Sequence, residues 1–170
     1  NKKKNNYLKT INKEIEINLE NIFTKLSIPL NKFNLLGKIE KGKFVKILSK
    51  SEFPDKKYLD ISLKKDLKSK KKILEIFTNY PKALLVDYNF FKGLVGGSLL
   101  YTSKFNDNSS ESILSIKDFK VKNAPAFAKL LTLADLKGVG DLLKGDGISF
   151  EILEIKSTDN KELLTINEIY

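Results

Sequence analysis

The chain has 170 residues, of which 41% are hydrophobic and 31% charged, a composition typical of one folded domain. It contains no Cys and no His, which excludes disulfides, zinc fingers, thiol nucleophiles, imidazole bases and Ser-His-Asp triads made by this chain alone. No apolar run approaches the roughly 20 residues that span a bilayer as a helix. The chain does not begin with Met, so we expect Asn1 to be an internal residue of a longer protein.

The net charge of +10 would ordinarily indicate nucleic acid or an anionic membrane surface as a partner. All 31 basic residues are Lys, however, and Arg supplies the bidentate fork that suits phosphate and guanine. The lysines are spread along the chain, which is typical of a solvated face and of the codon bias of an AT-rich genome. Charge alone therefore does not predict a nucleic-acid partner.

Alternation of apolar and polar residues with period two predicts a series of strands. After a polar linker over residues 1–10, we expect a single β-rich domain over 11–170. Lys41-Gly42 separates two alternating segments and predicts a tight antiparallel hairpin. In chain order, the apolar phases of the main strands are Ile15, Ile17 and Leu19; Phe33, Leu35 and Ile39; Leu59, Ile61 and Leu63; Leu99 and Tyr101; and Ile148, Phe150 and Ile152.

Three segments are less regular. Residues 70–78 are too short for periodicity to separate strand from helix, and we favour a strand. Pro81 suits a first helical turn, so a short helix is expected over 81–88. Residues 113–121 form another strand whose apolar phase shifts, which predicts a β-bulge near Lys117-Asp118. Leu164 and Ile166 mark a final strand.

The segment 123–145 departs from the strand pattern and predicts an inserted pair of helices. A DNA-reading helix would need polar residues near its start, whereas the second helix begins with apolar residues and glycines over 136–140. We therefore expect the pair to pack over one end of the sheet as a cap. Its apolar positions at helical spacing are Phe127, Leu130, Leu131, Leu136, Leu142 and Leu143.

Little in the chain predicts chemistry. Asp141, Asp146 and Glu151 lack the spacing of a calcium loop, and no metal is expected. The glycines over 93–97 and 138–147 lack the strand-loop-helix context of a phosphate-binding loop. We therefore expect no catalytic residue and no cofactor, and interpret the protein as a non-enzyme.

The stretch DFKVKNAPAFAKLLTLADLKGVGDLLKGDGISFEIL, over 118–153, resembles the signature near the C-terminal end of large AsmA-like proteins of the YhdP and TamB group in diderm bacteria. The resemblance covers residues 80–170, and the first 80 residues match only as generic strands. The chain has Lys and Asn where the family is usually richer in Arg and Gly. The resemblance is carried by Asp118-Phe119, Ala124-Pro125, Leu130-Leu131, Leu142-Leu143, Gly145-Asp146-Gly147 and Phe150.

This resemblance implies a periplasmic protein anchored in the inner membrane by a helix outside this chain. Its long β-sheet would curl into a hydrophobic groove that carries phospholipid between the inner and outer membranes. The expected fold is then a mostly β, curled antiparallel sheet with a short helix and the helical pair. The apolar strand positions given above are the candidate groove residues, whose partners would be phospholipid acyl chains.

Three alternatives stay open. Ordinary packing of two sheets would produce the same alternation as an open groove. The chain could instead be an envelope scaffold that aids outer-membrane protein insertion, with a partner strand added at a sheet edge. A basic nucleic-acid-binding module is a third interpretation, and the favoured function involves no nucleic acid.

Overall fold

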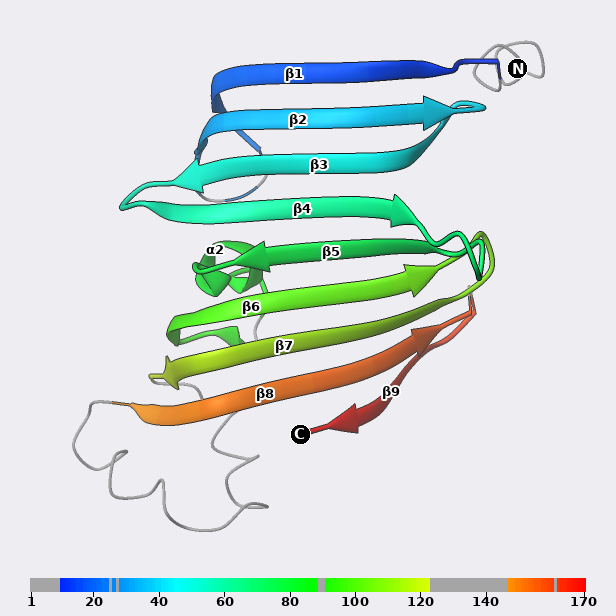
Figure 1. Cartoon of the computed structure of the whole chain (residues 1–170). Helices are drawn as coiled ribbons and strands as arrows, with labels where there is room; N and C mark the ends of the chain where they lie inside the picture. The colour runs from blue at the N-terminus through cyan, green and yellow to red at the C-terminus, as the bar shows by residue number, and fades with distance from the viewer. Residues whose placement is uncertain (1–9, 25, 27, 89–90, 123–146, 161) are drawn as a thin grey trace.

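The computed structural model describes residues 10–24, 26, 28–88, 91–122, 147–160 and 162–170. These residues form one nine-stranded sheet in which every strand pairs antiparallel with its neighbour in sequence (Figure 1). The strands are β1 (Lys13–Ile22), β2 (Leu30–Glu40), β3 (Lys43–Phe53), β4 (Lys57–Lys65), β5 (Lys72–Thr78), β6 (Leu94–Phe105), β7 (Ser110–Val121), β8 (Ile148–Asp159) and β9 (Leu164–Ile169).

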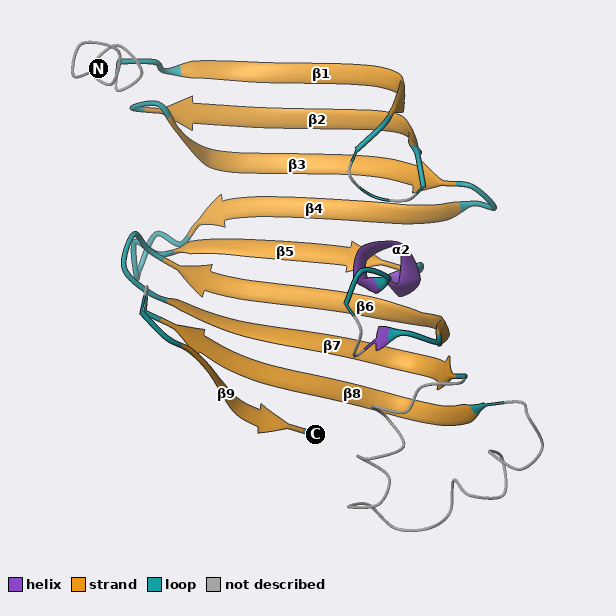
Figure 2. Cartoon of the chain, turned by 180° about the vertical axis from the view of Figure 1, so that it is seen from behind, coloured by secondary structure: helices purple, strands orange, loops and turns teal. Residues whose placement is uncertain are grey.

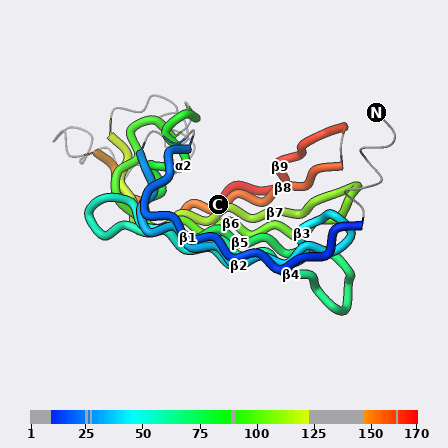
Figure 3. The backbone as a smooth tube through the Cα atoms, turned by 90° about the horizontal axis from the view of Figure 1, so that it is seen from above, coloured from blue at the N-terminus to red at the C-terminus, as the bar shows by residue number. Residues whose placement is uncertain are grey.

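The sheet is curled and does not close into a barrel, because β1 and β9 remain its two edges. The predicted mostly β, curled antiparallel fold is therefore confirmed. The short helix α2 (Pro81–Leu85) packs on one face, called here the inner face (Figure 2). Seen along the sheet, β8 and β9 rise toward the same side as α2, so the inner face is concave (Figure 3).

The hairpin between β2 and β3 forms as its sequence predicts. Glu40 pairs with Lys43, and the two residues between them have positive φ angles, 51° at Lys41 and 73° at Gly42. A two-residue turn with both residues in the left-handed region matches the twist of the flanking strands. The strand expected over 70–78 is also confirmed, since β5 pairs with both β4 and β6.

The core lies at the α2 end of the inner face, where Leu85 and Ala83 join two apolar clusters. Leu85 packs in a cluster with Leu99, Ile116 and Leu153, among others. Ala83 belongs to a second cluster with Leu30, Phe53 and Leu59. The expected helix at 81–88 is confirmed in a shorter form, and it stabilises the fold by bridging the floor of the sheet on both sides.

The inner-face positions of β7 shift by one residue, as predicted. The predicted β-bulge near Lys117-Asp118 is wrong, because the shift arises from the backbone conformation instead. Asp118 has a positive φ of 52° and faces Gly97, whose φ is 82°. The pairs on either side, Ser98 with Lys117 and Gly96 with Phe119, keep one register, so no extra residue is inserted. Buried Ile116 and buried Phe119 therefore share the inner face, although residues three positions apart in a regular strand point to opposite faces.

Candidate apolar groove

An apolar cavity of about 510 Å³ lies on the inner face beyond the core. Its floor is formed by β5 to β8, one wall by α2 and the turn after it, and the other wall by β9. The lining residues are Ile76, Leu84, Leu85, Tyr88, Phe91, Leu99, Tyr101, Leu114, Ile155, Ser157, Leu164 and Ile166.

The groove is open to solvent along its rim. Tyr88 on the α2 side has an exposed fraction of 62%, and Leu164 and Ile166 on β9 have exposed fractions of 64% and 57%. On the floor, Leu99 is buried, while Leu114 and Ile155 are half-buried. Apolar side chains thus face a hollow that water can enter, which is costly unless something apolar occupies it.

The floor also carries a short chain of hydroxyl groups. The Tyr101 hydroxyl donates a hydrogen bond to Ser112 Oγ at 3.1 Å, and Ser112 Oγ donates to Ser103 Oγ at 2.9 Å. Ser103 and Ser112 are buried, and these bonds meet their need for partners. The buried Ser49 Oγ, by contrast, has no hydrogen-bond partner among the described residues.

The structure distributes the predicted groove residues unevenly. Of these residues, Leu99 and Tyr101 line the cavity, and Phe150 stacks on Phe119 at a centroid distance of 5.1 Å beside it. Leu59, Leu63 and Ile148 are buried. The remaining inner-phase positions extend the apolar surface over β1, β2 and β4, outside the cavity: Ile15, Ile17, Leu19, Phe33, Leu35, Ile39 and Ile61.

Ile152 is placed away from the groove. It pairs with Lys117, whereas the next residue, Leu153, pairs with Ile116 and packs in the core. Because neighbouring residues of a strand point to opposite faces, Ile152 lies on the outer face. The prediction that Ile152 shares a face with Ile148 and Phe150 is therefore wrong. The inner-face positions shift by one residue at Gly97 in β6 and Asp118 in β7, and the same shift occurs in β8 between Phe150 and Leu153.

Several residues that line the groove were not among the predicted groove residues. For some of them, strand alternation in the sequence could have indicated the position. Leu114 alternates with Ile116, and Ile155 and Ser157 continue the phase of Leu153. Leu84, Leu85, Tyr88 and Phe91 had no strand signal, because they come from α2 and the segment after it. The expected helical cap over 123–145 lies outside the described residues, as do residues 1–9 of the expected linker over 1–10.

A second hollow, of about 440 Å³, lies over the outer face. Its lining includes Lys50, Asp60 and Glu75, and Ser62 Oγ donates to Glu75 at 3.1 Å. This hollow is thus partly charged, whereas none of the described residues that line the inner groove is charged. The inner groove is the better site for an apolar ligand.

The carboxylates and lysines with shifted pKa values lie outside the groove. The pKa values of Glu40, Asp66 and Glu111 are lowered, chiefly by hydrogen bonds from Lys38, Ser69 and Lys71 respectively. Among the described residues, no three carboxylates gather where they could hold a metal ion. In the same part of the chain, no helix has the length and apolarity needed to cross a bilayer.

Comparisons of this chain with protein-family models, curated proteins and solved structures yield no match. The fold and the groove therefore define the protein only as an open, curled antiparallel sheet with an apolar concave face.

Proposed function

We propose that this chain binds phospholipid acyl chains in the groove between α2 and β9, without catalysing a reaction. The observation that carries the proposal is an open cavity of about 510 Å³ whose lining, among the described residues, is largely apolar and uncharged. Its volume falls within the roughly 300–1,000 Å³ of typical small-molecule sites. Each methylene group that leaves water there contributes about 0.8 kcal/mol.

The shape of the groove suits an amphipathic molecule. The apolar floor of Leu99, Leu114 and Ile155 takes the acyl chain, while the open rim leaves the head group in water. The apolar inner face also continues over β4, β2 and β1 as a shallower surface. This face therefore offers a lipid further apolar contacts beyond the cavity, interrupted at β3 by Ser49 and Ser51.

The wider role rests on the resemblance of residues 118–153 to the AsmA-like family. On that basis the chain is part of a longer β-groove protein of the periplasm, anchored in the inner membrane through a segment outside this chain. It carries phospholipid between the inner and outer membranes, in contact with other envelope proteins. This role needs no cofactor and no nucleic acid.

The test uses a matched pair of variants that differ in the face they alter. Ser157→Phe places a ring in the groove, and Ser115→Phe places the same ring on the outer face of the neighbouring strand. We expect the native chain and Ser115→Phe to copurify with phospholipid detected by mass spectrometry of organic extracts. Ser157→Phe should retain several-fold less. Lipid at the level of an unrelated control protein in all three would contradict the proposal.

An envelope scaffold that accepts a partner strand is the second candidate, and the state of β9 favours it. Every residue of β9 is exposed, and among the described strands it pairs with β8 alone. Because the chain has no Cys, a single Thr165→Cys change introduces a unique thiol at this edge. Efficient disulfide trapping of an envelope protein at that site, together with absence of bound lipid, would favour the scaffold over transport.

A further inference from the structure

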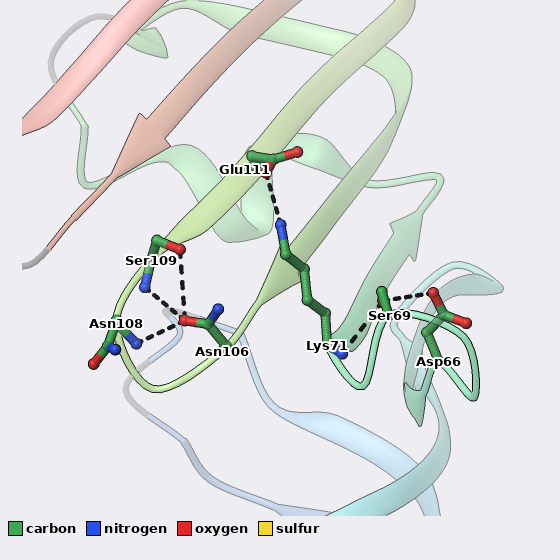
Figure 4. Close-up of polar contacts among 7 residues, drawn as sticks. All are labelled: Asp66, Ser69, Lys71, Asn106, Asn108, Ser109 and Glu111. Carbon is green, nitrogen blue, oxygen red and sulfur yellow. Dashed lines mark hydrogen bonds and ion pairs between the residues drawn. The ribbon is translucent and has the colours of Figure 1, made fainter.

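The loop between β4 and β5, residues 66–71, has features that the groove does not explain. It lies at the end of the sheet opposite α2, beside the loop between β6 and β7 (Figure 4). In the edge-on view this loop projects past the sheet on the side away from α2 (Figure 3).

The loop and its flanks are strongly basic. The sequence KKDLKSKKK over 64–72 holds six lysines and one carboxylate, Asp66. Lys64 pairs with Glu75 at 3.5 Å and Lys71 with Glu111 at 2.8 Å. No ion pair within the described residues involves Lys68 or Lys70, and both are exposed. The local charge is therefore only partly compensated by the protein itself.

An apolar side chain stands at the tip of this basic loop. Leu67 has an exposed fraction of 93%, the highest of any large apolar side chain in the described ranges. A single exposed Leu is ordinary on a protein surface. Here, however, lysines flank the exposed Leu67 on both sides. The projecting loop therefore combines an apolar tip with positive charge.

The loop conformation holds Leu67 outward. Asp66 Oδ1 accepts a hydrogen bond from the Lys68 backbone N–H at 3.0 Å, and Asp66 Oδ2 accepts one from the Ser69 hydroxyl at 2.6 Å. The backbone N–H of Asp66 donates to the Lys71 carbonyl at 2.8 Å, and that of Lys70 to the Asp66 carbonyl at 3.0 Å. The one local carboxylate is thus used to fix the turn.

We propose that this loop docks on a bilayer surface that carries anionic head groups. The lysines would face lipid phosphates, and Leu67 would enter the boundary between head groups and acyl chains. Each basic residue near such a surface contributes about 1 kcal/mol, and an apolar residue adds its transfer into the interface. Nucleic acid would use the lysines but has no use for Leu67, and Lys lacks the fork of Arg for base edges.

Docking through this loop would turn the end of the sheet opposite α2 toward a membrane. The inference does not depend on lipid in the groove. A chain that binds vesicles but copurifies with no lipid would keep this inference and lose the proposed function. A chain that copurifies with lipid but does not bind vesicles would keep the proposed function and lose this inference.

The test is flotation of the 170-residue chain with vesicles of two parts phosphatidylcholine to one part phosphatidylglycerol, and with vesicles of phosphatidylcholine alone. Leu67→Ser removes the apolar tip, and Lys68→Gln with Lys70→Asn removes two charges. The matched controls lie at the opposite end: Phe23→Ser, at an 88% exposed side chain, and Lys56→Asn with Lys82→Gln. Lys56, like Lys70, has a positive φ.

We expect the native chain to float with the anionic vesicles and not with the neutral ones. Removal of the two loop lysines should weaken partitioning roughly tenfold or more, and Leu67→Ser roughly tenfold. The controls should stay within about twofold of the native chain. Equal losses in loop and control variants would overturn the proposal. So would release by duplex DNA together with native binding by Leu67→Ser, because that result would assign the loop to nucleic acid.

Discussion

Gly97 in β6 and Asp118 in β7 face one another across the sheet, and both have positive φ angles. This pair changes which residues point inward without changing the register of the strands. As a result Phe119 and Val121 join the same core cluster as Ile116 and Leu99.

The first prediction concerns this pair. A Cβ at Gly97 would lie 2.7 Å from the Lys117 carbonyl oxygen and 2.8 Å from Phe119 Cβ. Gly97→Ala should therefore destabilise the fold by more than the roughly 1–3 kcal/mol of a strained backbone alone. Gly96→Ala is the control, because its φ is also positive but nothing lies within 4 Å of its Cβ. Chemical denaturation should show the larger loss for Gly97→Ala, and equal losses would contradict this account.

The second prediction concerns the serines on the inner face. Ser49 Oγ is buried and has no hydrogen-bond partner in the described part of the chain, so Ser49→Ala should leave stability unchanged or raise it by up to about 1 kcal/mol. Ser112 accepts from Tyr101 and donates to Ser103, so Ser112→Ala should cost about 1–3 kcal/mol. Thermal unfolding of the two variants can be compared directly. A larger loss for Ser49→Ala would show that its hydroxyl has a partner after all.

The third prediction concerns α2. Leu85 is buried and packs against the floor of the sheet, so Leu85→Ala should cost about 2–5 kcal/mol. The neighbouring Val86 is 37% exposed, and Val86→Ala should change stability by no more than about 0.5 kcal/mol. Urea denaturation of both variants measures the difference. Similar small effects would mean that α2 is not docked.

The fourth prediction concerns pH. The pKa of Asp66 is lowered first by the hydrogen bond from the Ser69 hydroxyl and then by the Lys68 backbone N–H. A lowered pKa in the folded state means that the turn gains stability above the unfolded pKa and loses it as the pH falls through the folded value. Ser69→Ala should raise the pKa of Asp66 in an NMR titration. Ser109→Ala, in the adjacent loop, should not, and an unchanged pKa in Ser69→Ala would contradict the geometry.

The fold was largely predictable from the sequence because most strands show their own alternation and adjacent strands pair in order. The Lys41-Gly42 hairpin is a clear case, since a Gly turn between two alternating segments has few other solutions. The groove was harder to predict. Ile152 follows the alternation of Phe150 in the sequence, yet it lies on the outer face. The reason is that Gly97 in β6 and Asp118 in β7 shift the inner-face positions by one residue. Leu84 in α2 and Tyr88 in the turn after it line the groove through tertiary packing, which strand periodicity does not report.

The most direct test of the account distinguishes the two faces at adjacent residues. Leu114 lines the groove, whereas Ile113 has an exposed fraction of 42% and points to the outer face. A photoreactive benzoylphenylalanine is placed at one position or the other, and the irradiated protein is analysed by mass spectrometry for covalent phospholipid adducts. The account predicts adducts at position 114 and few or none at 113. Equal labelling, or labelling at 113 alone, would contradict acyl-chain binding in the groove.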